Sequence, residues 1–89
     1  MNLSSVCRRI KASEGAERVR LCHIRRIRDM AIALETRFPE VREVQQIKQK
    51  HCRWLLEHWC RPSTKKDYRS SLRLLLEALG RDPNWLKQI

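Results

Sequence analysis

The sequence predicts an all-α fold, a compact bundle of four main helices with a short N-terminal helix and a short C-terminal turn. Only two glycines and three prolines occur in 89 residues, which suits helices joined by short connections. Apolar residues recur at helical spacing through most of the chain, and no segment has a convincing strand alternation. We expect a single domain over residues 1–89, with a short helix or arm at 1–15 and the bundle at 16–89.

The opening segment has the pattern of a short helix. Its apolar residues recur at helical spacing, at Leu3, Val6 and Ile10. Either Asn2 or Ser4 can cap this helix, because a short polar side chain accepts a hydrogen bond from the first turn. Residues 11–15 then end in Gly15 and are expected to break the helix.

Residues 16–38 have the clearest helical pattern. The expected buried stripe consists of Ile24, Ile27, Ala31, Leu34 and Phe38, and it is widened by Val19, His23 and Met30. A proline pushes the residue before it away from helical backbone angles. Pro39 is therefore expected to end this helix.

Residues 39–47 are expected to form a linker, and residues 48–60 a third helix. The linker has three apolar anchors, Val41, Val44 and Ile47. The apolar arc of the helix is expected to contain Ile47, His51, Trp54, Leu55, His58 and Trp59. Arg61 and Pro62 are expected to stop this helix.

A fourth helix is expected over residues 64–79, with Ser63 as its N-cap. Its buried residues are expected to be Tyr68, Leu72, Leu75, Leu76 and Leu79. Gly80 suits the position after the last turn, where a left-handed backbone is favoured. Residues 82–83, an Asp-Pro pair, begin a final turn that folds two apolar residues back onto the core, Trp85 and Leu86.

The chain is strongly basic, with a formal net charge of +10 at pH 7. The excess is five positive charges in residues 1–37, two in 38–62 and three in 63–89, so it is distributed over the structured segments. A folded basic surface of this kind indicates a polyanionic partner. No apolar run approaches the length of a membrane span and the N-terminus has no signal-peptide pattern, so we expect a cytoplasmic protein without a membrane partner.

The expected phosphate contacts lie on one flank of the fourth helix, at Lys66, Arg69 and Arg73. Thr64 and Lys65 stand at the start of this helix, where free backbone N–H groups also favour anions. The remaining candidate DNA-binding residues are Arg25, Arg26, Lys48 and Lys50. The alternative is an ordinary solvated helix face without a ligand.

No catalytic constellation is evident, so we expect neither an enzyme nor a cofactor or small-molecule substrate. The four cysteines, Cys7, Cys22, Cys52 and Cys60, are expected to be reduced thiols without metal, because their spacing is not that of zinc ligands. The histidines and tryptophans lie at core spacing and are expected to anchor the bundle rather than to stack on bases. Tyr68 lacks catalytic partners and is expected to be a core residue.

Residues 47–81, IKQKHCRWLLEHWCRPSTKKDYRSSLRLLLEALGR, resemble the N-terminal SAM-like, or core-binding, domain of phage integrases and other tyrosine recombinases. The first part of the family pattern is matched by Ile47, His51, Trp54 and Leu55, and the second by Thr64, Ser70, Ser71, Leu72, Arg73 and Leu74. Lys48, Lys65 and Arg69 depart from the pattern, and they make this flank more basic.

The resemblance implies non-catalytic binding to double-stranded DNA near a recombination site, through the phosphate backbone and the major groove, beside other recombinase protomers. In that family a separate domain carries the catalytic groups. The alternative is a small basic interaction protein, such as an inhibitor encoded by a phage or mobile genetic element, which binds an acidic protein surface. An RNA-binding helical module is a further alternative, separated from the first by competition between duplex DNA and structured RNA.

Overall fold

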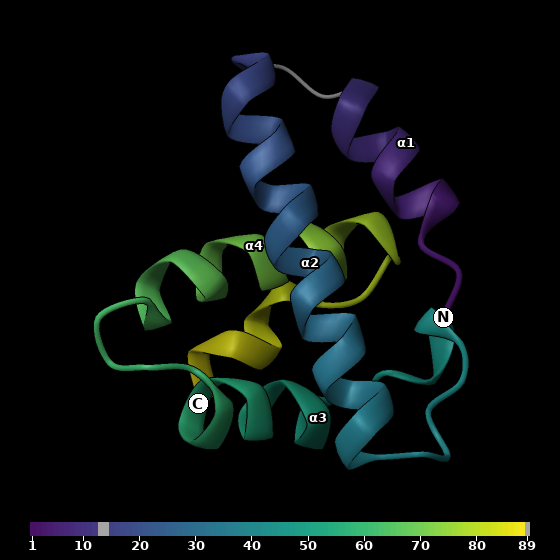
Figure 1. The fold of residues 1–89 in the computed structure, drawn as a ribbon, viewed down its shortest axis with the longest axis vertical. Coiled ribbons are helices and arrows are strands. Elements are labelled where there is room, and N and C mark those ends of the chain that lie inside the picture. The colour runs from purple at the N-terminus through teal and green to yellow at the C-terminus, as the bar shows by residue number, and fades with distance from the viewer. Residues whose placement is uncertain (13–14, 89) are drawn as a thin grey trace.

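Four α-helices, one of which continues into a turn of π-helix, form most of the chain in the computed structural model (Figure 1). The structure describes residues 1–12 and 15–88, and these contain no strand. The helices are α1 (Ser4–Ala12), α2 (Glu17–Arg37), α3 (Gln49–Trp54) and α4 (Lys65–Ala78). The π-helical turn is η2 (Leu55–Trp59), and two 3₁₀ segments are η1 (Val44–Gln46) and η3 (Pro83–Gln88). The predicted all-α bundle is confirmed.

α1 and α2 form where the apolar spacing predicts them. The Asn2 side chain accepts a hydrogen bond from the Ser4 N–H (2.9 Å) and caps α1, which buries Val6, Cys7 and Ile10. α2 ends before Pro39, as expected. The predicted break over residues 11–15 includes residues 13–14, which lie outside the described residues.

The buried stripe of α2 differs from the prediction at one residue. Ile24, Ile27, Met30, Ala31 and Leu34 are buried, and Phe38, just after the helix, is half-buried. Val19, by contrast, is 53% exposed. Val19 belongs to the first turn of α2, and in Figure 1 this end of the helix extends beyond α4.

The expected helix over residues 48–60 changes its winding halfway. The Cys60 N–H donates to the Leu55 carbonyl (2.8 Å), five residues back, which defines a π-helical turn. The wider turn rotates the side chains that follow. Leu56 is therefore buried and His58 exposed, so the prediction that His58 belongs to the apolar arc is wrong. The linker anchors Val41, Val44 and Ile47 are all buried as predicted.

α4 begins one residue later than predicted. Residue 64, not Ser63, occupies the N-cap position, because residues 61–64 form a turn in which the Thr64 N–H donates to the Arg61 carbonyl (3.0 Å). Leu72, Leu75 and Leu76 are fully buried, whereas Tyr68 and Leu79 are half-buried.

The chain reverses after α4 at Gly80, which has a left-handed backbone (φ 72°). The Gly80 N–H donates to the Glu77 carbonyl (3.1 Å) and the Arg81 N–H to the Leu76 carbonyl (2.9 Å), the paired bonds of a Schellman motif. This turn sends η3 back along α4. Leu86 is buried there, and the predicted return of the C-terminal turn to the core is confirmed.

One continuous core joins these elements. Most of its largest fully buried side chains come from α2, η2 and α4, and these are Ile27, Met30, Leu34, Leu55, Leu56, Leu72, Leu75 and Leu76. The radius of gyration is 12.1 Å, and a compact domain of this length has about 12 Å. No helix among the described residues is both long and apolar enough to cross a bilayer.

We expect Gly80→Ala to lower the free energy of unfolding by about 1–2 kcal/mol, because a side chain in the left-handed region meets its own backbone. No other atom lies within 4 Å of the added Cβ, so crowding contributes nothing. Gly80→Asn is the matched control, since asparagine tolerates this conformation better. Urea unfolding followed by circular dichroism measures both. Equal losses in the two variants would contradict the assignment of the cost to backbone conformation.

Candidate nucleic-acid interface

A hollow of about 410 Å³ lies between α4 and η3. It is lined by Arg69, Ser70 and Arg73 of α4 and by Asn84, Leu86 and Lys87 of η3. Three cationic side chains from two elements thus meet neutral hydrogen-bonding groups. A guanidinium, an ammonium, a hydroxyl and a side-chain amide are all groups that contact phosphate oxygens in protein–DNA complexes.

The Schellman turn at Gly80 and the cap of η3 bring the two sides of this hollow together. The Asp82 side chain accepts from the Asn84 N–H (2.9 Å), and its carbonyl accepts from the Trp85 N–H (3.1 Å). These bonds start η3, and the buried Leu86 holds it against the core. Lys87 follows directly and therefore lies beside the basic flank of α4.

The two arginines of the hollow differ in their exposure to solvent and in their hydrogen bonds. Arg69 is half-buried and donates to the backbone carbonyl of Leu86, so it also holds η3 in place. Arg73 is exposed, and its Nε donates to Glu77 Oε1 at 3.3 Å. The side chains of this pair are 67% and 46% exposed. Exposed pairs of this kind contribute little to stability, so a phosphate can compete for Arg73.

The other candidates on α4 lie at its start. Lys66 is exposed on the same flank as Arg69 and Arg73. Lys65 is half-buried near Cys60; burial raises the pKa of the Cys60 thiol, and the charge of Lys65 partly offsets this increase. Thr64 does not cap the helix with its side chain, because its hydroxyl donates to the Arg61 carbonyl (3.3 Å).

Lys48 and Lys50 flank the beginning of α3, and both are exposed. Gln49, between them, donates its side-chain amide to the Trp85 carbonyl at 3.3 Å. This bond places the start of α3 next to η3. The two lysines therefore lie near the segment that carries Lys87.

Arg25 and Arg26 lie on a different side of α4. α2 packs on the side of α4 that carries Tyr68 and Ser71, whereas Arg69 faces η3. Neither Arg25 nor Arg26 lines the α4–η3 hollow. The structure therefore brings Lys66, Arg69 and Arg73 together with Lys87, but leaves the two α2 arginines apart from them.

Lys87, Ser70 and Asn84 were not singled out as contacts from the sequence alone. The signal for Lys87 was nevertheless present, because the expected turn at residues 82–83 returns Leu86 to the core. A residue that directly follows a buried apolar residue must lie beside the element on which that apolar residue packs. Ser70 belongs to the family pattern but carries no charge, so charge patterning passes over it.

Tyr68 is a packing residue with a protonated hydroxyl. Its ring packs edge-on against Trp59, with ring centres 5.1 Å apart, and its hydroxyl donates to Asp29 Oδ2 at 3.4 Å. Burial and the neighbouring carboxylate of Asp29 raise the pKa of Tyr68, while Arg25 acts in the opposite direction. The phenol therefore stays neutral at physiological pH, as a structural residue would.

His23 and His51 support the core as predicted. His23 Nδ1 lies 2.8 Å from the Ser71 hydroxyl, between α2 and α4. The Lys48 N–H donates to His51 Nδ1 (2.8 Å), so the proton of the neutral ring is on Nε2, which is buried without a hydrogen-bond partner in the described part of the chain. Burial lowers the pKa of both histidines, and the charge of Arg26 adds to this for His23 and that of Lys50 for His51.

The cysteines are free thiols, and Cys7 and Cys52 are buried. Burial raises the pKa of Cys52 to about 12, so this thiol is not a nucleophile at neutral pH. Among the described residues, no group of three His, Cys, Asp or Glu side chains is placed to hold a metal ion.

No family model, curated protein or solved structure matches this chain. The resemblance to the core-binding domains of integrases therefore stays a prediction that rests on the residues of 47–81.

Replacing Tyr68 by phenylalanine is expected to cost less than about 1 kcal/mol of stability, since the hydrogen bond to Asp29 is long and lies near solvent. Tyr68→Ala should cost more than Tyr68→Phe, because it also removes the packing against Trp59. Thermal unfolding of the two variants compares them. A phenylalanine variant as unstable as the alanine variant would show that the hydroxyl, not the ring, carries the stabilisation.

His51→Gln is expected to weaken the acid sensitivity of the fold. A histidine whose pKa is lowered on folding binds protons more readily when unfolded, so stability is full above pH 6.5 and falls as the pH drops toward the folded-state pKa. For one proton the slope is at most about 1.4 kcal/mol per pH unit. Glutamine keeps an acceptor for the Lys48 N–H without titrating.

The measurement is urea unfolding between pH 7.5 and pH 5, roughly one unit or more on either side of an ordinary histidine pKa. His23 titrates in the same direction and should leave a residual slope in the variant. An unchanged pH dependence would show that His51 does not contribute to the acid sensitivity.

Proposed function

We propose that this chain is a non-catalytic module that binds double-stranded DNA through the α4–η3 face. The observation that carries the proposal is the convergence of Arg69, Arg73 and Lys87 from two elements on one hollow. With the exposed Lys66 on the same flank, and Lys48 and Lys50 at the adjoining start of α3, these side chains form the basic face. Within residues 1–12 and 15–88, no acidic side chain lines the hollow itself.

The neutral groups of the hollow favour a phosphate backbone as the ligand. Ser70 and Asn84 are exposed and can donate to phosphate oxygens beside the charged groups. Arg73 and Lys66 lie on the solvent side of α4, where a duplex can approach without disturbing the core. Leu86 is buried at the base of the hollow, which gives the cations a low-dielectric support on one side.

In its more specific form, the proposal is that the module is of the integrase core-binding type. The module would then hold one side of the duplex near a recombination site, while a catalytic domain supplies the chemistry. Lys48, Lys65 and Arg69, which depart from the family pattern, all stand on or beside the basic face. The departures thus add phosphate contacts in the place where the proposal needs them.

Binding to DNA should depend strongly on salt. If about five phosphates are contacted, the affinity falls by about 10²–10³ between 50 mM and 200 mM salt. Replacing Arg73 and Lys87 by alanine should weaken binding by about tenfold or more and reduce the slope of log K against log salt by about 2. Fluorescence anisotropy with a labelled duplex of about 20 base pairs, two helical turns, measures both quantities.

The matched control is the double variant K11A/R28A, which removes the same two positive charges from α1 and α2. It should bind DNA as the unaltered protein does, within about twofold. An equal loss in the two double variants would show that net charge, and not the α4–η3 face, drives binding. A structured RNA that competes as well as the duplex would replace DNA by RNA as the ligand.

A further inference from the structure

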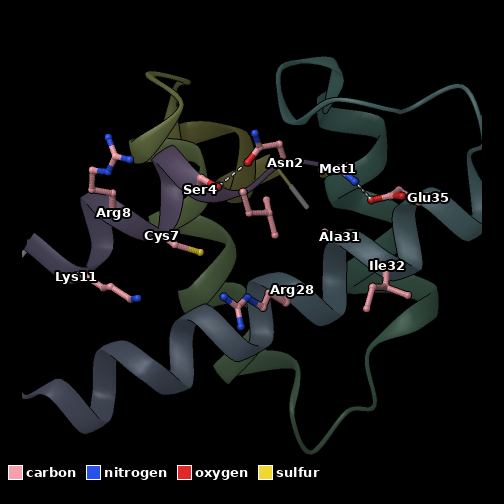
Figure 2. A pocket seen from close by; sticks show the side chains of 11 residues that line it. Met1, Asn2, Ser4, Cys7, Arg8, Lys11, Arg28, Ala31, Ile32 and Glu35 are labelled. Carbon is pink, nitrogen blue, oxygen red and sulfur yellow. Dashed lines mark hydrogen bonds and ion pairs between the residues drawn. The ribbon is translucent and has the colours of Figure 1, made fainter.

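A second surface lies between α1 and α2, and its side chains differ in chemistry from those of the α4–η3 face. A groove of about 790 Å³ lies between α2 and the N-terminal segment with α1 (Figure 2). The groove and the α4–η3 hollow have no lining residue in common. Its volume is in the range of ligand sites, about 300–1,000 Å³. We propose that this groove binds an acidic amphipathic helix of a partner protein.

Two cationic side chains line one end of the groove. In Figure 2, Lys11 of α1 and Arg28 of α2 point toward one another across the gap between the helices, whereas Arg8 points away from both. Neither Lys11 nor Arg28 forms an ion pair within the described residues. Two like charges that face each other repel, and a carboxylate that binds between them relieves the repulsion.

The middle of the groove is apolar. Cys7 and Ala31 are buried in its floor, with 8% and 6% of their surface exposed, and Leu3 is half-buried beside them. Ile32, also a lining residue, is 65% exposed and is the most exposed large hydrophobic side chain in the described part of the chain. An isoleucine on a helix face loses this contact with water only when another apolar surface covers it.

At the far end of the groove, a carboxylate is paired with a positively charged group. The Glu35 carboxylate accepts from the Met1 ammonium group at 2.6 Å. Figure 2 shows this pair at the opposite end from Lys11 and Arg28. Glu35 is the one acidic side chain among the described lining residues, and it lies away from the end where a ligand carboxylate would contact Lys11 and Arg28.

The spacing of the lining residues on α2 favours a helix as the occupant. Arg28 and Ile32 are four residues apart, so they follow each other on one face of α2. A partner helix that lies along α2 can match them with a carboxylate and an apolar side chain one turn apart. The other occupants fit less well. A second copy of this chain has the same charge of +10, and a phosphodiester backbone has no apolar group for Ile32.

The test uses a fluorescein-labelled helical peptide of about 18 residues, or five turns, with leucines along one face and glutamates beside them. Anisotropy should show saturable binding. K11A/R28A should weaken it by about tenfold or more, and Ile32→Ser by about fivefold or more. The same peptide with glutamine in place of glutamate should bind at least about tenfold more weakly, since it lacks the charges.

The DNA-face variant R73A/K87A is the matched control, and it should bind the peptide within about twofold of the unaltered protein. Equal losses in the two double variants, or no effect of Ile32→Ser, would overturn the proposal. Displacement of the peptide by dodecanoate, with the same sensitivity to K11A/R28A, would assign the groove to an acyl carboxylate instead. Concentration-dependent dimerisation that Ile32→Ser abolishes would assign it to a second copy of the chain.

Discussion

The packing of α2 across α4 and η2 determines where every other part of this molecule lies. Ile27, Met30 and Leu34 of α2 are completely buried in that contact. The hydrogen bond between His23 and Ser71 (2.8 Å) lies between the same two helices and fixes how far one is shifted along the other. A polar pair in an apolar contact costs free energy if it is misaligned, so it selects one register among several that would bury similar area.

Once α2 is placed, two separate surfaces each carry part of the positive charge of the chain. The basic flank of α4 faces away from α2 and receives η3, while the outer side of α2 faces α1 and forms the groove. The two surfaces differ in kind, because one combines cations with small polar groups and the other combines cations with exposed apolar groups. Among the described residues, the linings of the two surfaces share no residue, so the two proposed ligands would not compete for the same side chains.

Periodicity and cap signals predicted the helices well, since each helix buries a stripe that is visible in the sequence. Each exception has its own cause. His58 was misplaced because the π-helical turn bonds Cys60 to Leu55, and no residue type announces such a turn. Val19 was misplaced because it lies in the first turn of α2, and periodicity does not show how far a helix extends beyond the element on which it packs. Lys87 was missed as a contact because its neighbours come from α4, which periodicity within one element cannot supply.

Arg69 has two roles, because its guanidinium group donates a hydrogen bond to the Leu86 carbonyl. The Arg69 side chain lines the cationic hollow, and it also holds η3, which forms the other wall of the hollow. A substitution at Arg69 therefore combines a lost charge with a displaced wall, whereas substitutions at Arg73 and Lys87 leave the contact with the Leu86 carbonyl intact. A ligand that drew the Arg69 guanidinium outward would therefore remove one of the contacts that hold η3, and would leave the buried Leu86 and the bond from Gln49 to the Trp85 carbonyl to keep the C-terminal segment in place.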